Sequence, residues 1–128
     1  MPMLTLDPET IERESVQTDI AAIARYLQES LGQKITAYLS GLTDAKVVGK
    51  WARGEAKPKG FAETRLRHAY QVAKLIVDAY DADTARAWLF GCNTRLGDRA
   101  PALVLRYAGT PDGLASIVPT ARAFAATE

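Results

Sequence analysis

A long amphipathic stripe constrains the fold of this 128-residue chain more than any other feature of its sequence. Between residues 62 and 79, apolar side chains recur at steps of three and four, as they do on the buried face of a helix. The positions of this stripe are Leu66, Ala69, Tyr70, Ala73, Ile76 and Val77, and Tyr80 continues it one residue past the expected helix end. The stripe therefore predicts one long central helix, whose apolar face other elements must cover.

Shorter apolar repeats on both sides of the stripe predict further helices. The expected helices cover residues 18–31, 33–40, 44–53, 83–90, 102–107 and 112–126. Pro119 lies inside the last of these, where it must either kink the helix or mark a late start. Because no alternating run of β-branched residues is flanked by hairpin turns, we expect an all-α fold.

The connector between residues 91 and 101 is rich in turn-forming residues. We expect Asn93 and Gly97 to adopt positive φ, which these residue types do more readily than others. Pro101 should start the next helix, because its missing N–H is not needed there. Trp88 and Leu96 are predicted to be structural residues, with Trp88 where the long helix meets the terminal one.

Composition disfavours several classes of protein. No apolar run reaches 18 residues, so we expect no membrane span. The only cysteine, Cys92, cannot form an internal disulfide, which is typical of the reducing cytoplasm. The only histidine, His68, has no catalytic partner nearby in sequence, and one Cys with one His makes no metal cluster. We therefore expect a cytoplasmic protein that is not an enzyme and binds no cofactor or metal.

Charge is distributed unevenly, although the formal net charge is only +1. Residues 1–33 carry six acidic and two basic residues, whereas residues 34–74 carry nine basic and three acidic ones. Residues 75–128 are nearly balanced. This segregation is compatible both with a solvated face of mixed charge and with a site for an anionic partner.

The basic segment contains the pattern of a helix-turn-helix: two short helices joined by a turn that begins at Gly41. Trp51 in the second helix should be buried and fix the angle at which that helix docks. Lys46, Lys50 and Arg53 would then form one exposed basic ridge that can reach guanine edges or phosphates in the major groove. Further DNA contacts are predicted at Lys34, Thr43, Lys57 and Lys59.

Residues 33–58 resemble the DNA-binding region of Xre-type, lambda-repressor-like regulators. The resemblance is carried by the order W-x-x-G, followed by basic residues and a proline. The sequence departs from that pattern at Val48, where a polar residue is usual, and Ala45 and Gly49 are small. We expect Gly49 to face the groove, at a position where a larger side chain would collide with DNA.

A second pattern occupies residues 84–109, TARAWLFGCNTRLGDRAPALVLRYAG. An A-x-x-W-L helix leads to an N-x-x-L-G turn, and then to a basic residue, a small residue, a proline and an apolar turn. The residues at these positions are Ala85, Trp88, Leu89, Asn93, Leu96, Gly97, Arg99, Ala100, Pro101 and Leu105. This segment and the helix after it resemble the toxin-binding domain of the Xre/MbcA/ParS antitoxin family.

The resemblance implies an antitoxin of a type II toxin–antitoxin system, which neutralises a RES-domain toxin that consumes NAD. It also implies repression of the protein's own operon through operator DNA, and a homodimer or higher oligomer. In this family the C-terminal region covers the entrance to the toxin's active site. Toxin contacts are therefore expected at Arg122, Phe124 and Glu128. Arg95 and Arg99 are added to this set because they are hard to explain as core residues.

Three regions follow from these patterns. We expect a flexible arm over residues 1–17, a helix-turn-helix region over 18–60 and a helical toxin-binding domain over 61–128, packed together through the long helix. Two alternatives remain open: a stand-alone repressor of the prophage or phage-immunity type, and a structural adaptor that oligomerises through its terminal helix. An adjacent gene for a RES-type protein would favour the antitoxin.

Overall fold

The computed structural model describes residues 9–11 and 18–127, and these residues form helices and turns without a β-strand. The all-α fold is thereby confirmed. The first half contains α2 (Ile20–Leu31), α3 (Gln33–Ser40) and α4 (Lys46–Ala52), followed by the long helix α5 (Phe61–Ala79). The second half contains α6 (Ala82–Phe90), η1 (Thr94–Leu96), α7 (Pro101–Tyr107), η2 (Pro111–Leu114) and α8 (Ile117–Ala125), where η marks a 3-10 turn.

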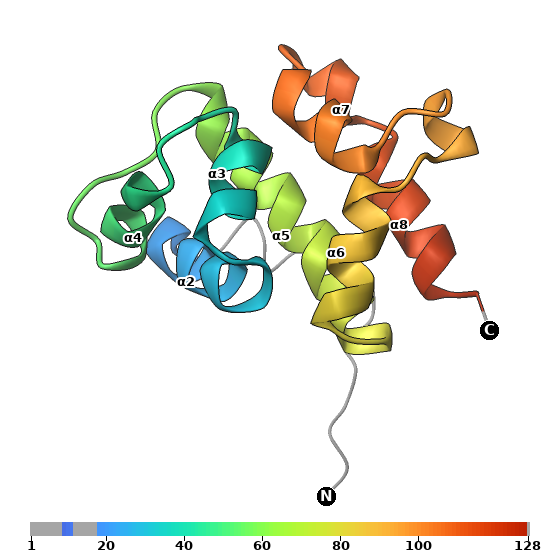
Figure 1. Cartoon of the computed structure of the whole chain (residues 1–128), viewed down its shortest axis with the longest axis horizontal. Helices are drawn as coiled ribbons and strands as arrows, with labels where there is room; N and C mark the ends of the chain where they lie inside the picture. Colours follow the sequence, from blue (N-terminus) through green and yellow to red (C-terminus); the bar gives the residue numbers. More distant parts are fainter. Residues whose placement is uncertain (1–8, 12–17, 128) are drawn as a thin grey trace, which may run out of the picture.

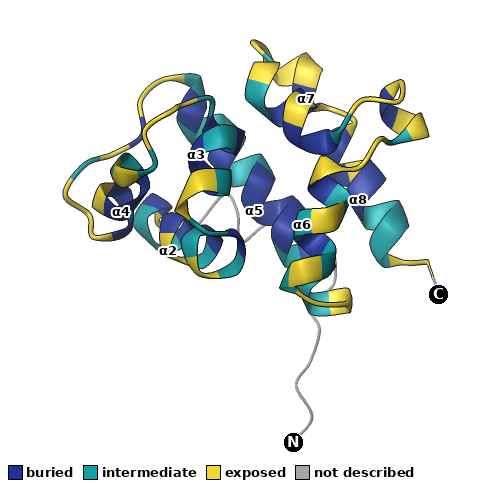
Figure 2. Ribbon diagram, in the orientation of Figure 1, coloured by how far each residue is buried: buried dark blue, intermediate teal, exposed yellow. Residues whose placement is uncertain are grey.

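Helix α5 is central, with α2, α3 and α4 on one side and α6, α7 and α8 on the other (Figure 1). It packs against all of these helices except α4, which lies mainly on α2. Leu66, Ala73 and Ile76 of the predicted stripe are fully buried, and Figure 2 shows α5 dark blue where the other helices cover it. Val77 is only partly buried, and Tyr80, just beyond the end of α5, is 45% exposed.

Of the predicted arm, the structure describes only residues 9–11, which are helical. Ile11 in this segment is 1% exposed and belongs to the hydrophobic core. The rest of the predicted arm, residues 1–8 and 12–17, lies outside the described residues. Every helix within the described ranges is too short or too polar to cross a lipid bilayer.

The connector between α6 and α7 differs from the prediction in one respect. Gly97 adopts the expected left-handed conformation, with φ of 67°, but Asn93 has φ of −130°, so the prediction for Asn93 is wrong. Its side chain instead accepts a hydrogen bond from the backbone N–H of Arg95 and caps η1. The second positive φ, 64°, falls on Asp98. An asparagine suits either role, and only the surrounding chain decides which it takes.

Two prolines occupy the first turns of their helices. Pro101 is the first residue of α7, as predicted, and is buried. Helix α8 begins only at Ile117, so Pro119 follows a late start and does not kink a longer helix. In the first turn a missing N–H leaves no helical hydrogen bond unmade.

Arginine side chains join the two halves at the end of α3. Arg106 on α7 donates to the carbonyl oxygens of Tyr38 and Leu42, both at 3.0 Å. Arg65 on α5 donates to the carbonyl oxygen of Ser40 at 3.3 Å and to another carbonyl just after α7. Because carbonyls in the last turn of a helix have no partner within it, these cations fix the start of the following turn.

Candidate nucleic-acid interface and partner surface

The predicted helix-turn-helix segment consists of α3, the turn at residues 41–45 and α4. The side chain of Asp44 accepts a hydrogen bond from the backbone at the start of α4, at 3.0 Å. Trp51 is 2% exposed and lies in the hydrophobic core, as predicted. Arg25 of α2 donates to the carbonyl oxygen of Ala52 at 2.8 Å. Helix α4 is therefore short but held at both ends.

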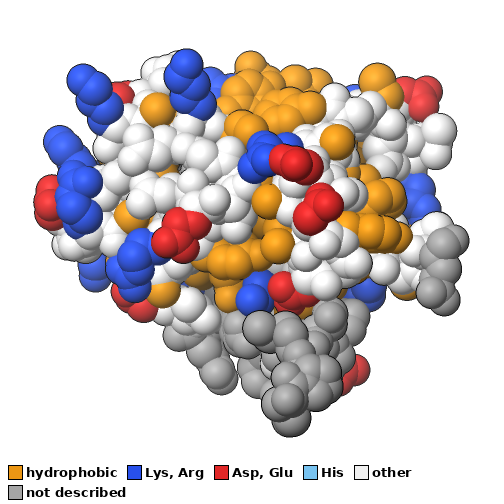
Figure 3. All heavy atoms as spheres, turned by 60° about the horizontal axis from the view of Figure 1, so that its bottom comes forward, with side chains coloured by type: hydrophobic (Ala, Val, Ile, Leu, Met, Phe, Trp, Pro, Cys, Tyr) orange, Lys and Arg blue, Asp and Glu red, His pale blue; other side chains and the backbone are white. Residues whose placement is uncertain are grey.

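Five lysines predicted to contact DNA are exposed around this segment. They are Lys34 in α3, Lys46 and Lys50 in α4, and Lys57 and Lys59 in the following loop. Their ammonium groups make no hydrogen bond or ion pair with any residue that the structure describes. Figure 3 shows Lys and Arg side chains along the left-hand end of the molecule, where Figure 1 places α4 and the loop. We call this set of five residues the lysine surface.

Lys34 and Thr43 line one pocket of about 360 Å³ between α3, the turn and α7. Tyr38 and Leu42 form its apolar wall, and Arg106 of α7 contributes a second cation. None of the lining residues is acidic. Two predicted DNA contacts thus lie together beside the start of α4.

Arg53 is exposed, as predicted, but its guanidinium is occupied. It donates to the carboxylate of Glu55, with Nε to Oε2 at 2.6 Å and Nη2 to Oε1 at 3.3 Å. The two side chains are 58% and 56% exposed. The hydrogen bond from Arg53 holds the pKa of Glu55 below its ordinary value. The carboxylate is therefore charged at neutral pH and lies at the end of the predicted basic ridge.

Gly49 is buried, so the expectation that it faces the DNA groove is wrong. A Cβ at this position would lie 3.0 Å from Nε2 of Gln33 on α3 and 3.1 Å from Nη1 of Arg53. The glycine thus leaves room for two side chains of the protein itself. Helical spacing placed Gly49 on the outer face of α4. Spacing within one helix carries no information about its neighbours, and here Gln33 at the start of α3 covers the position.

Besides Arg53, three of the nine basic residues in the segment 34–74 are engaged within the fold. Arg65 bonds to carbonyl oxygens at the end of α3 and after α7. Arg67 pairs with Glu63 at 3.1 Å, and Lys74 pairs with Asp78 at 3.9 Å. All three lie on α5, away from α4. The charge count of the sequence therefore overstates what this segment offers to a partner.

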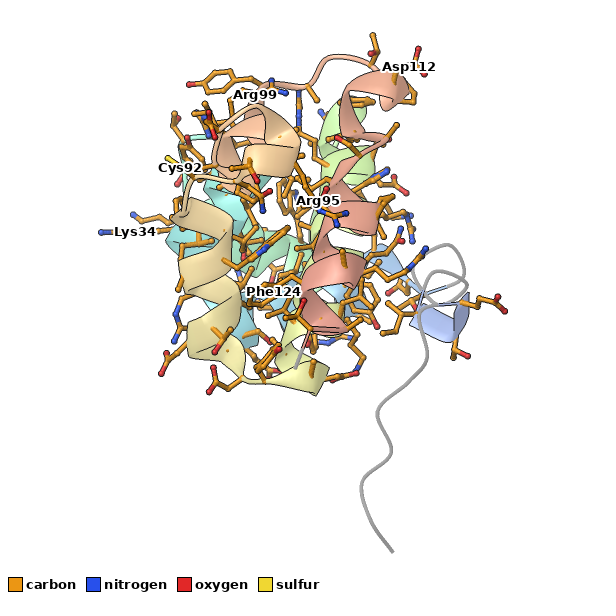
Figure 4. All side chains as sticks on the ribbon, turned by 90° about the vertical axis from the view of Figure 1, so that its right-hand side faces the viewer. Lys34, Cys92, Arg95, Arg99, Asp112 and Phe124 are labelled. Atoms are coloured by element: carbon orange, nitrogen blue, oxygen red, sulfur yellow. The ribbon has the colours of Figure 1, made fainter. Side chains whose placement is uncertain are left out.

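Two predicted toxin contacts, Arg95 and Phe124, line one pocket of about 180 Å³ beside α8. Figure 4 shows both on this face, with Arg99 above them and Lys34 pointing away at the edge. The ring of Phe124 lies 6.1 Å from that of Trp88, so this tryptophan meets the terminal helix as expected. Trp88 is half-buried and also lines the pocket.

The remaining predicted toxin contacts are not part of this pocket. Arg99 lines a second pocket, of about 320 Å³, between α7 and η2. Arg122 lines a third, of about 230 Å³, together with His68 of α5. Glu128 lies outside the described residues. Neighbouring positions on α8 thus face different elements, and the predicted set is spread over three pockets.

An exposed apolar surface at α3, α6 and α7 was not predicted. Tyr107 is 69% exposed, Phe90 49% and Leu103 40%. The ring of Tyr38 lies 5.9 Å from that of Phe90, and the guanidinium of Arg106 lies 4.5 Å from the Tyr38 ring centroid. The signal was present in α7, PALVLRY, which carries more apolar residues than one buried face can hold. We call these five residues the α7 surface.

No family model matches the chain, and neither does any curated protein or solved structure. Among the residues described, no three His, Cys, Asp or Glu side chains lie together as a metal site requires. The two ends of the molecule differ in chemistry. Exposed lysines suit a polyanion, whereas exposed aromatic side chains with arginine suit a protein partner.

Proposed function

We propose that this protein is an antitoxin of a type II toxin–antitoxin system, which binds DNA through α3 and α4 and binds a toxin through its C-terminal half. The lysine surface carries the DNA-binding part of the proposal. Duplex DNA presents one negative charge per about 1.7 Å of helix axis, and lysines that neutralise phosphates release bound counterions. Five such lysines and Thr43 surround a helix that Trp51 and Arg25 hold in place.

The toxin would be a RES-domain enzyme that consumes NAD, and the DNA would be the operator of the protein's own operon. The sequence pattern of residues 84–109 supports this assignment. The pocket lined by Arg95 and Phe124, and the α7 surface, offer the aromatic and arginine side chains that are enriched at protein interfaces. A homodimer or higher oligomer would match a palindromic operator.

A stand-alone repressor without a toxin is the second candidate, because the lysine surface alone would suffice for it. The two candidates differ in whether the C-terminal half has a protein partner. They also differ in genetic context, since only the antitoxin requires a RES-type gene beside its own.

Reversing charge on α4 tests DNA binding. The double variant Lys46→Glu/Lys50→Glu should bind a duplex of its upstream region about 100-fold more weakly, as expected if each reversal costs about 1.4 kcal/mol. The slope of log affinity against log salt should fall by about 2. The matched control, Arg95→Glu/Arg99→Glu, changes the net charge equally in the other half and should bind the duplex nearly as the parent does. Equal loss in both variants would remove α4 from the interface.

Coexpression with a candidate RES-domain toxin tests the toxin part. The parent chain should restore growth and copurify with the toxin. Arg95→Glu/Arg99→Glu should weaken both effects, whereas Lys46→Glu/Lys50→Glu should preserve them. Failure of the parent chain to copurify with that protein would leave the stand-alone repressor.

A further inference from the structure

We infer that Glu55 occupies the site of a DNA phosphate on Arg53 and must be displaced when DNA binds. The inference rests on the proposed DNA-binding function. It identifies a residue that lowers the affinity of the protein for DNA. Glu55 would act as a competitor within the protein, so that binding to DNA exchanges one oxyanion for another.

The geometry of the pair is that of a guanidinium holding an oxyanion. Two nitrogen atoms of Arg53, Nε and Nη2, each donate to a different carboxylate oxygen of Glu55, at 2.6 and 3.3 Å. Carboxylates and phosphates both accept two parallel hydrogen bonds from arginine. The contact that Glu55 makes is therefore one that a phosphodiester can also make.

The location of the pair favours competition over a purely structural role. Arg53 follows the last residue of α4, and Glu55 is in the exposed loop that leads to Lys57 and Lys59. Both partners are more than half exposed, so the pair fixes no buried contact, and DNA could reach it without unfolding any element. Lys50 also acts on the carboxylate and, after Arg53, helps to hold the pKa of Glu55 below its ordinary value.

Gly49 leaves room for this arrangement. Because residue 49 has no Cβ, the guanidinium of Arg53 can lie close to α4. A Cβ added at this position would lie 3.1 Å from Nη1 of Arg53.

The other two acidic residues of the segment 34–74 are engaged away from this pair. The carboxylate of Asp44 accepts the backbone N–H of Lys46 at the start of α4, and Glu63 pairs with Arg67 on α5. Glu55 is thus the carboxylate that neutralises a side chain of the predicted ridge.

A double-mutant cycle on the full-length chain tests the competition. The variants are Glu55→Gln, Arg53→Gln and the two combined. The probe is a fluorescein-labelled 20-base-pair duplex of random sequence, titrated at low and at physiological salt by fluorescence anisotropy. Asp98→Asn is the matched control, because it changes net charge equally in the other half and asparagine tolerates the left-handed backbone of that position.

Glu55→Gln should tighten binding about two- to fivefold beyond the control, which is the range for loss of one exposed ion pair. In the Arg53→Gln background, Glu55→Gln should tighten binding to the duplex no more than the control Asp98→Asn does. Circular dichroism should show unchanged helicity in all variants.

Two outcomes would overturn the inference itself, and a third would refute the function on which it rests. Unchanged or weaker binding by Glu55→Gln would mean that Glu55 does not compete, or that it orients Arg53 for DNA. Tightening that persists without Arg53 would mean that Glu55 acts only through net charge. Failure of the parent chain to bind any duplex at low salt would instead refute the proposed DNA-binding function.

Discussion

The lysines around α4 and the arginines of the C-terminal half carry the same charge but make different contacts. Lys46 and Lys50 project from α4 into solvent. Arg65, Arg86 and Arg106 donate to backbone carbonyls of the other half. Arginine suits this role because its planar guanidinium carries five donors and is weakly hydrated, whereas the lysine ammonium is compact and strongly hydrated.

The arginines meet the ends of helices, where carbonyl groups carry partial negative charge. Arg86 donates to the carbonyl oxygen of Ser30, in the last turn of α2, and Arg25 does the same for Ala52, which ends α4. The basic residues of this sequence therefore serve two different purposes. The five lysines around α4 remain exposed to solvent, and most of the arginines that the structure describes hold the helices together.

The largest expected difference between the halves concerns their tryptophans. Trp51→Ala should lower the free energy of unfolding by about 3–5 kcal/mol, because Trp51 is 2% exposed and its loss leaves a cavity. Trp88→Ala should cost about 2 kcal/mol, because Trp88 is only half-buried. Urea unfolding followed by circular dichroism measures both. A larger loss for Trp88→Ala would place the stabilising core in the C-terminal half.

The arginine bridge between the halves is the next test. Arg106→Gln should cost about 1.5–3 kcal/mol, because it removes a cation that two carbonyl oxygens share. Arg95→Gln, which changes an exposed cation of the same half, should stay within about 0.5 kcal/mol of the parent. Urea midpoints for the two variants provide the comparison. Equal midpoints would mean that these hydrogen bonds do not hold the halves together.

Two glycines, one in each half, sharpen the comparison. Gly97→Ala should cost about 1–2 kcal/mol, because φ of 67° is unfavourable for a residue with a Cβ. Gly49→Ala should lie within about 0.5 kcal/mol of the parent, because a gain in helix propensity offsets the displacement of flexible side-chain ends. Thermal and urea unfolding report both effects. A large loss at Gly49 would show that α3 and α4 cannot move apart.

The smallest effect is a pH dependence at the start of α6. Hydrogen bonds from the side chain and backbone of Thr84 lower the pKa of Asp81. A lowered pKa means that this stabilisation is complete above the ordinary aspartate pKa, about 3.9, and is lost as pH falls through the folded-state value. Asp81→Asn keeps a capping oxygen but does not titrate. Melting temperatures between pH 5 and pH 2 should therefore fall less steeply for this variant than for the parent.

Features that depend on neighbours in sequence were predicted well. The three- and four-residue spacing gave the all-α class, α3 at its observed bounds, and α5 to within one residue. Burial of Trp51, the left-handed Gly97 and the helix start at Pro101 were also correct. Each of these follows from periodicity or from the backbone preference of a single residue, which the chain carries locally.

Features that depend on neighbours in space were not predictable in this way. Gly49 is covered by Gln33, Arg53 is held by Glu55, and Arg122 faces α5 on a different side from Phe124. The sequence alone determined which helices form and which of their positions are apolar, because hydrophobic spacing and turn chemistry act over a few residues. Only the tertiary structure decided which cations are engaged by carbonyls and which remain exposed, because hydrogen-bond partners come from whichever helix end the packing brings within reach.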